Sequence, residues 1–423
     1  MNLLLQSTTI LDNASEFHEK KKDILIENGV ITQIADQIIP RDDLLTINTP
    51  DLHVSQGWFD SGVSFGEPGY EERENIQNGL RTAACSGFTT VALNPNTLPV
   101  IESKSDVAFI REKASGNAVN LLPVAALTKK SEGKELAELY DASNAGAVAY
   151  YDYKTAITNA NLLKLALQYV QSFNGLVMSY PQDNSIAGSG IVNEEKTATY
   201  LGLKGIPYIA ENLQIARDLF LLEYTGGKLH IPTISTKGAV QLIREAKSKG
   251  LQVSCSVAVH NLFYSDTVLE GFDSNTKVLP PLRSEEDRNV LMEAVLDGTI
   301  DMVTSDHNPL NIELKKVEFD HAAYGTIGLE SAFGALNSLF TTAQTVEILT
   351  RGLELFGIKN ESVSVGAKAQ LSLFNPKINY RFSEGSIVSG STNSIFLEQK
   401  LKGKPLGIIA NNQYISVSEH GNQ

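Results

Sequence analysis

Short apolar runs alternate with longer stretches of helical pattern through the middle of the chain. The runs cover residues 58–65, 88–94, 120–127, 146–152, 176–180, 228–235, 252–259 and 301–306. Helical patterns fill most of the gaps, for example 156–170, 194–203, 215–223 and 285–296. Eight strands that alternate with helices over roughly 290 residues predict a (β/α)8 barrel, which is an α/β fold. A doubly wound sheet is the alternative, but no glycine-rich dinucleotide loop accompanies the pattern.

Both ends of the chain have a pattern typical of short β-strands. The segments 23–26 and 30–34 flank Asn28-Gly29, a strong hairpin signal. The segment 370–374 near the other end also has strand character. We therefore expect a small β-sandwich domain made from residues 1–54 and 355–423, and a barrel domain over residues 55–354.

Composition indicates an ordinary globular protein with an acidic surface. Of its 423 residues, 42% are hydrophobic and 20% are charged, and the net charge is −14. This balance argues against a general phosphate-binding surface, so we expect no nucleic-acid partner. Cys85 and Cys255 lie far apart in no metal or redox spacing, which favours buried thiols in a reducing compartment. With no signal-peptide pattern and no apolar run near the ~20 residues of a membrane span, we expect a cytoplasmic protein without a membrane partner.

A series of motifs in a fixed order carries a resemblance to a known family. The matching segments are 67–71, 87–91, 94–97, 202–207, 277–283, 297–301, 304–307 and 325–330, for example Glu-Pro-Gly-Tyr-Glu, Gly-Phe-Thr-Thr-Val and Thr-Ser-Asp-His. Over about residues 50–375 the chain resembles the dihydroorotase branch of the amidohydrolase superfamily. The resemblance implies the metal-dependent barrel type of that superfamily.

The resemblance also implies where a zinc site should lie, and most of those positions have changed. Family members supply two imidazoles from Asp-X-His-X-His after strand 1, a carboxylate after strand 4, one histidine each after strands 5 and 6, and an aspartate at strand 8. The last residue ligates metal and shuttles the proton. In this chain the corresponding residues are Gly62, Ser64, Asp152, Tyr180, Thr233 and Asp306. All four histidine positions are lost, and two carboxylates alone make a weak zinc site, so we expect no metal.

The positions implied for substrate recognition have changed as well. The family holds the substrate carboxylate with an arginine, two asparagines and a histidine. The corresponding residues here are Gly66, Asn96, Leu279 and Leu310, of which only Asn96 is retained. Burying an anionic carboxylate without its charged partner is costly, so we expect dihydroorotate to bind poorly.

Two other groups of residues in the sequence could carry chemistry. Asp306, His307 and His260 follow strands 7 and 8, and they could form a relocated metal site. Gly62-Val63-Ser64-Phe65-Gly66 matches the Gly-X-Ser-X-Gly nucleophile elbow, which would make Ser64 a nucleophile. That elbow turns directly from a strand into a helix, whereas Glu67-Pro68-Gly69 indicates a continuing loop.

Three functional hypotheses follow. The first is a catalytically inactive dihydroorotase homologue, a homodimer that acts as a non-catalytic assembly subunit with aspartate carbamoyltransferase. The second is an active zinc enzyme of pyrimidine biosynthesis that interconverts N-carbamoyl-aspartate and dihydroorotate, with Asp306 as the proton shuttle. The third is a small-molecule binding module that uses Asn96, Asp152, Tyr180, His260 and Asp306 at the barrel mouth.

Overall fold

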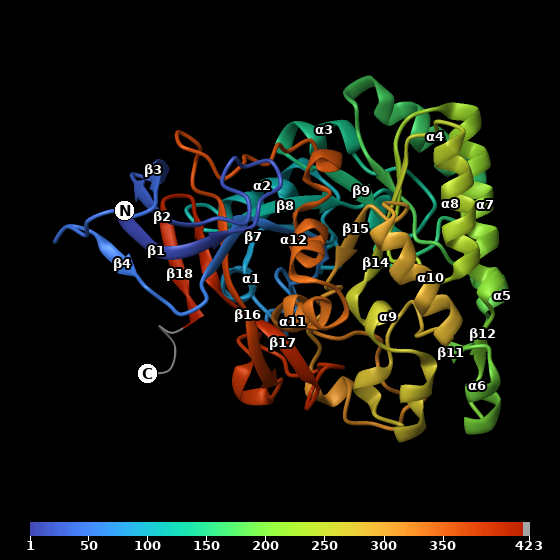
Figure 1. Ribbon diagram of the computed structural model, residues 1–423. Coiled ribbons are helices and arrows are strands. Elements are labelled where there is room, and N and C mark those ends of the chain that lie inside the picture. The colour runs from blue at the N-terminus through green and yellow to red at the C-terminus, as the bar shows by residue number, and fades with distance from the viewer. Residues whose placement is uncertain (418–423) are drawn as a thin grey trace.

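Eight parallel strands form the ring at the centre of the computed structural model, which describes residues 1–417 (Figure 1). In ring order they are β6 (Trp58–Val63), β7 (Phe88–Leu93), β8 (Asn120–Ala125), β9 (Ala149–Tyr151), β10 (Val177–Met178), β13 (Leu229–Ile231), β14 (Val253–Ala258) and β15 (Met302–Thr304). Each strand lies within one of the eight apolar runs. The (β/α)8 barrel expected from the sequence is therefore confirmed.

Helices cover the outside of this ring. The longer ones are α1 (Ile76–Cys85), α2 (Lys104–Lys113), α4 (Ala160–Val170), α7 (Tyr208–Thr225), α8 (Lys237–Ser248), α10 (Glu285–Leu296), α11 (Leu329–Leu339) and α12 (Thr342–Thr350). Shorter elements are α3 (Leu139–Ala145), α5 (Asn184–Ala187), α6 (Lys196–Leu201), α9 (Val259–Phe263) and the strand pair β11 (Val192–Asn193) and β12 (Gly205–Ile206). Within residues 1–417, no helix is both long and apolar enough to cross a membrane.

The interior of the barrel is a packed apolar core. Phe59, Ala92, Val124, Ala149 and Met302 come from five of its strands and are at most 2% exposed. The short 3-10 helix η6 (Leu353–Phe356) adds Leu353 and Phe356 to the same cluster. Because bulky side chains from several strands fill the centre, the barrel is a solid core with its functional surface at the ends of the strands.

Asp60 joins the first and last strands of the ring. Its carboxylate accepts hydrogen bonds from the Thr304 hydroxyl at 2.6 Å and the Ser305 N–H at 2.9 Å, and also from the Gly62 N–H at 3.0 Å. The side chain is buried, so these three donors replace the water that an aspartate would otherwise require. Asp60 thereby fixes β6 against β15 beside the mouth of the barrel.

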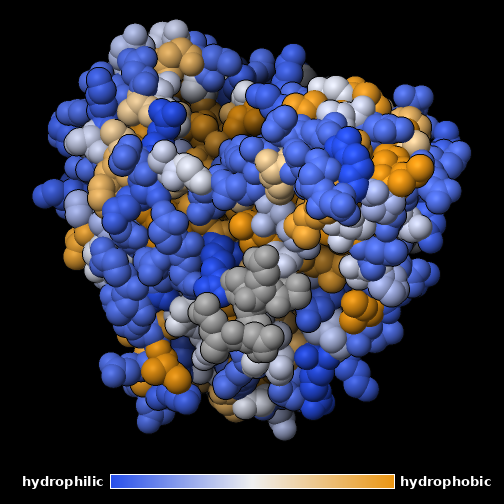
Figure 2. All heavy atoms as spheres, turned by 90° about the vertical axis from the view of Figure 1, so that its left-hand side faces the viewer, coloured by the Kyte–Doolittle hydropathy of each residue, from blue (hydrophilic) through white to orange (hydrophobic). Residues whose placement is uncertain are grey.

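The two ends of the chain build a second sheet, which also has eight strands within residues 1–417. Its strands are β1 (Asn2–Ile10), β2 (Lys21–Glu27), β3 (Val30–Ala35), β4 (Leu45–Ile47), β5 (His53–Gln56), β16 (Leu371–Arg381), β17 (Lys400–Ala410) and β18 (Gln413–Ser416). They form one hydrogen-bonded sheet around an apolar cluster that includes Leu3, Ile24, Val54 and Leu371. The face of the molecule on this side is mostly hydrophilic (Figure 2).

Two details of this sheet follow from its sequence. Asn28 and Gly29 connect β2 to β3 with φ angles of 52° and 77°, the left-handed conformations that the hairpin signal predicts. The segment between β16 and β17 leaves the sheet and contacts the barrel loops. There, Ser389 and Gly390 donate to Glu74, and Asn393 donates to the Asn308 carbonyl.

Candidate functional site

The carboxyl ends of the barrel strands bring most of the sequence-predicted site positions to one rim. Gly62 lies at the end of β6, Tyr180 follows β10, Thr233 follows β13 and Asp306 follows β15. A cavity of about 20 Å³ remains at this rim, and Gly62, Thr233 and Asp306 are in contact with it. It is lined by Ser61, Gly62, Asn94, Tyr151, Tyr153, Lys154, Met178, Pro232, Thr233, Ser256, Thr304 and Asp306.

Lys154 occupies the centre of this rim, and the sequence interpretation did not include it. Its ammonium nitrogen lies 2.8 Å from Asp306 Oδ2, and the two side chains are 11% and 4% exposed. The residue follows β9 in a left-handed conformation, φ 49°, and its N–H donates to the Tyr151 hydroxyl at 3.0 Å. The sequence feature that could have identified Lys154 is a lysine shortly after strand 4, two residues beyond Asp152.

The ion pair decides the electrostatics of Asp306. Complete burial raises the pKa of its carboxyl group, and the positive charge of Lys154 opposes that rise. A buried carboxylate is tolerated when it is paired and hydrogen-bonded. In this protein the partner is Lys154, a side chain of the same barrel whose ammonium group lies 2.8 Å from the carboxylate.

Three tyrosines fill much of the remaining space at the mouth. Tyr151 and Tyr180 are at most 3% exposed and belong to the apolar cluster of the barrel interior, and Tyr153 packs against that cluster. Burial raises the pKa of all three hydroxyl groups well above the usual value for tyrosine. The three hydroxyl groups therefore stay protonated at neutral pH. The tyrosines fill space at the mouth and do not serve as phenolate ligands.

Asp152, which the resemblance places among the metal-site positions, is bonded to the loop after β8. One carboxylate oxygen accepts the N–H groups of Leu127 and Thr128, each at 2.9 Å, and the other accepts the Thr128 hydroxyl. The side chain thus fixes the loop after β8, and Asp152 is absent from the lining of the cavity beside Asp306. Of the two carboxylates expected at the mouth, only Asp306 faces it.

The backbone at two former ligand positions is held in an unusual conformation. Thr233 has φ 50° and Asp306 has φ 49°, the left-handed region that a β-branched residue such as threonine adopts at a cost. The Thr233 hydroxyl is buried and has no hydrogen-bond partner within residues 1–417. The strand end therefore has a strained shape although the threonine hydroxyl gains no hydrogen bond from it.

The alternative metal site and the alternative nucleophile both lack the required geometry. His307 Nδ1 accepts the Gly328 N–H at 3.2 Å, and neither His307 nor His260 lines the cavity beside Asp306. Burial lowers the pKa of each of these two imidazoles to about 3, so both are neutral. Ser64 follows the end of β6, but α1 begins only at Ile76, so there is no strand-to-helix elbow.

His230 in strand β13 has a structural environment. Its two ring nitrogens lie 2.9 Å from Ser254 Oγ and 3.2 Å from Ser256 Oγ on the neighbouring strand β14. Burial lowers its pKa to about 3. A neutral imidazole bound on both sides cross-links the two strands.

The positions implied for the substrate carboxylate have no common anion site. A Cβ atom at Gly66 would lie 1.8 Å from the Tyr70 carbonyl oxygen, so an arginine could not stand there without movement of the loop. Leu279 packs against the apolar cluster that contains Tyr180. Leu310 lines a different cavity of about 490 Å³, and Asn96 lines neither that cavity nor the small one beside Asp306.

Comparison with known proteins places this barrel in a family. The Dihydro-orotase-like family model matches residues 54–239. The dihydroorotase of Geobacter metallireducens is 36% identical over 410 residues, which is 95% of this chain and 96% of that protein. The chain belongs to the dihydroorotase family. A second member, the dihydroorotase of Caldanaerobacter subterraneus subsp. tengcongensis, is 37% identical over 95% of this chain and 94% of its own length.

Solved structures show the same architecture. The L-hydantoinase of Arthrobacter aurescens superposes with a TM-score of 0.85 at 20% identity, covering 98% of this chain and 96% of its own. A D-hydantoinase from Thermus sp. gives a TM-score of 0.79 at 19% identity, covering 98% of this chain and 96% of its own. The dihydroorotase-family chain therefore has the amidohydrolase fold over almost its whole length.

The residues at the mouth do not fit the zinc that the family resemblance implies. Zinc requires about three nitrogen, sulfur or carboxylate ligands, and the former histidine positions offer glycine, serine, tyrosine and threonine. The one carboxylate that faces the mouth, Asp306, is already paired with the ammonium of Lys154. Across residues 1–417, no group of three or more His, Cys, Asp or Glu side chains is placed to hold a metal ion.

Proposed function

We propose that this chain is a catalytically inactive member of the dihydroorotase family that serves pyrimidine biosynthesis as a non-catalytic subunit. The observation that carries the proposal is the ion pair between Lys154 and Asp306 at 2.8 Å. It places a fixed cation against the aspartate that, by the resemblance, would bind metal and move the proton. A carboxylate engaged in this way is a poor metal ligand and a poor general base.

The size of the mouth supports the same proposal. The cavity beside Asp306 is about 20 Å³, which is enough for about one water molecule. A ring the size of dihydroorotate is much larger than this cavity, so side chains that line it would have to move. The active-enzyme alternative therefore requires a rearranged mouth in addition to new metal ligands.

The binding-module alternative receives less support. Of the five residues assigned to it, only Asp306 lines the cavity at the mouth. Asp152 is bonded to the loop after β8, and burial keeps His260 neutral within the barrel wall. These side chains do not converge on one space that could hold a metabolite.

The decisive experiment measures metal content and turnover on the same preparation. We expect freshly purified protein to contain far less than one zinc per chain, and to convert neither dihydroorotate nor N-carbamoyl-aspartate above the buffer rate when zinc is added. Zinc near one equivalent together with turnover would overturn the proposal.

A pair of restored variants provides the matched control. Histidine is introduced at the four lost positions, 62, 64, 180 and 233, once with Lys154 intact and once with Lys154→Ala. A Cβ atom at Gly62 would lie 3.5 Å from Thr304 Oγ1, an ordinary contact, so the backbone at this position accepts a side chain. We expect zinc binding at least ten-fold tighter when Lys154 is also removed. Equal zinc affinity in the two variants would show that Lys154 does not block the metal site.

The assembly role extends the proposal to a partner. A folded barrel without chemistry can still contribute a surface, and the family resemblance implies aspartate carbamoyltransferase as the partner. We expect the two proteins, mixed at micromolar concentration, to elute together at a mass greater than either alone. Separate elution of the two proteins would exclude this partner and leave the catalytic question untouched.

A further inference from the structure

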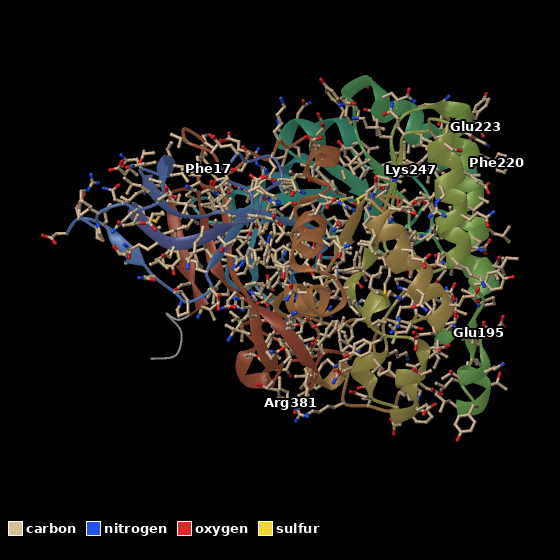
Figure 3. The ribbon with its side chains drawn as sticks, in the orientation of Figure 1. Phe17, Glu195, Phe220, Glu223, Lys247 and Arg381 are labelled. Carbon is tan, nitrogen blue, oxygen red and sulfur yellow. The ribbon has the colours of Figure 1, made fainter. Side chains whose placement is uncertain are left out.

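The segment between β16 and β17 forms part of a cavity on the barrel. Arg381, the last residue of β16, lies at the lower edge of the molecule in Figure 3, and the segment follows it. Its residues 384, 390–393 and 397 line the cavity of about 490 Å³, together with residues 310–313, 315 and 316 from the loop after β15. The bonds that hold this segment against the barrel therefore determine the shape of the cavity.

Two buried carboxyl groups hold the middle of this segment. Glu330, in the first turn of α11, accepts the N–H groups of Val388 at 3.1 Å and Ser389 at 3.0 Å on its Oε1 atom. Glu74, which precedes α1, accepts the Ser389 hydroxyl at 2.7 Å and the Gly390 N–H at 3.0 Å on its Oε2 atom. The two glutamates are 8% and 2% exposed. All four of these bonds end on a carboxyl group, so they respond to its charge.

The two carboxyl groups are close to each other because both bind Ser389. Its N–H donates to Glu330 and its hydroxyl donates to Glu74. Two buried carboxyl groups that lie on either side of one residue cannot both ionise without a large cost. Burial raises the pKa of both groups, and the charge of Glu74 raises the pKa of Glu330 further.

The groups packed around the pair supply no counter-charge. The guanidinium of Arg73 lies over the Tyr70 ring, 4.0 Å from its centre, and Asn78 on α1 gives Glu74 a neutral donor at 2.6 Å. Within residues 1–417, neither Glu74 nor Glu330 has a lysine, arginine or histidine among the groups that shift its pKa. The titratable groups that share a cavity of about 40 Å³ with Glu330 are Tyr380 from β16, Lys404 from β17 and Cys85 from α1.

Glu330 can take up a proton without losing either of its bonds to the segment. Both N–H groups donate to Oε1, and the buried Oε2 atom has no hydrogen-bond partner within residues 1–417. A proton on Oε2 removes a buried charge and leaves Oε1 as the acceptor.

We propose that Glu74 and Glu330 form a proton-controlled clamp on residues 388–390. The clamp holds the segment while at least one of the two carboxyl groups is protonated, and it loosens when both are ionised. Since the segment forms part of the cavity of about 490 Å³, the clamp controls the shape of that cavity. This proposal does not depend on whether the barrel is catalytic.

The direction of the pH effect follows from the burial of the pair. Opening of the segment hydrates both carboxyl groups and returns each pKa toward the ordinary value of about 4.3. From that pH up to the raised pKa, the closed segment binds more protons than the open one, so opening is favoured as the pH rises. A pKa one unit higher in the closed segment changes the ratio of open to closed molecules about ten-fold.

Hydrogen exchange of the full chain, read by mass spectrometry of its peptides, tests the clamp. After correction for the intrinsic effect of pH on exchange, the amides of residues 388–390 should be protected about ten-fold less at pH 8 than at pH 5. The amides of β14 report global unfolding and should change much less. Protection of residues 388–390 that is equal at the two pH values, or greater at pH 8, would overturn the proposal.

Glutamine variants test whether these two groups are the cause. Glu74→Gln and Glu330→Gln keep an oxygen acceptor and remove the charge, so each should reduce the pH difference, and the double variant should abolish it. Glu384→Gln is the matched control, because Glu384 lies exposed on the same segment and should keep the wild-type pH difference. If Glu330→Gln does not fold, Glu74→Gln alone decides. A pH difference in Glu74→Gln as large as in the wild type would contradict the clamp.

Discussion

Replacing Lys154 with methionine is the most direct test of how the mouth of the barrel is held. Methionine keeps much of the length and volume of the lysine side chain and removes the ammonium group. Asp306 then remains 4% exposed without its 2.8 Å partner. Breaking a buried ion pair on one side typically costs about 3–5 kcal/mol, since the remaining charge is uncompensated.

The same reasoning predicts a rescue. Asp306→Asn alone leaves the lysine ammonium buried without a carboxylate and should also be strongly destabilising. The double variant Lys154→Met/Asp306→Asn has no uncompensated charge. Its loss in free energy of unfolding should therefore be about 2–3 kcal/mol smaller than the sum of the losses in the two single variants. Urea unfolding followed by the fluorescence of Trp58 measures this cycle. Trp58 is the only tryptophan and lies buried in β6, so it reports on the barrel.

The pH dependence of the Lys154→Met variant has a definite sign. Burial raises the pKa of Asp306 in the folded protein, and removing the opposing lysine raises it further. A carboxyl group with a raised folded-state pKa binds more protons when folded, so stability falls as pH rises through the interval from its unfolded value of about 4 to the raised value. The loss relative to wild type should therefore be larger at pH 8 than at pH 5. A loss independent of pH, together with strict additivity in the cycle, would refute the buried ion pair.

Two further substitutions probe the neighbouring parts of the mouth. Asp60→Asn should cost about 1–3 kcal/mol, because the amide cannot accept all three of the hydrogen bonds that Asp60 receives from Gly62, Thr304 and Ser305; the urea midpoint measures it. Tyr180→Ala should cost about 3–5 kcal/mol, as expected for removing a buried aromatic side chain. Tyr224→Ala is its control, because the Tyr224 ring is 77% exposed and its removal should change the free energy of unfolding by no more than about 0.5 kcal/mol.

The sequence predicted the fold well because the barrel is specified by local patterns. Each of the eight apolar runs contains one strand, and Asn28-Gly29 forms the expected hairpin. The prediction was less accurate at helix starts. The pattern 215–223 lies within α7, which begins at Tyr208, because the apolar outer face of that helix obscures its period.

The candidate site was predictable only in part. The loss of histidines at 62, 64, 180 and 233 can be read directly from the chain, but the direction in which a side chain points cannot. Asp152 and Lys154 are two residues apart after β9, and the left-handed backbone at Lys154 helps to place its side chain at the mouth while Asp152 caps the loop after β8. Which of these two side chains lies at the mouth depends on tertiary contacts with Thr128 and Asp306, and no local sequence pattern encodes those contacts.

The ion pair between Lys154 and Asp306 supports the mouth of the barrel without requiring a metal ion. Asp306 and Thr233 retain left-handed φ angles at the ends of β15 and β13, so the backbone there still costs free energy. The buried Asp306 carboxylate at this place is paired with a cation. Lys154 supplies that cation from within the chain, at a fixed position and without dependence on metal supply. With this pair in place, Tyr151, Tyr153 and Tyr180 fill the mouth although positions 62, 64, 180 and 233 carry no histidine.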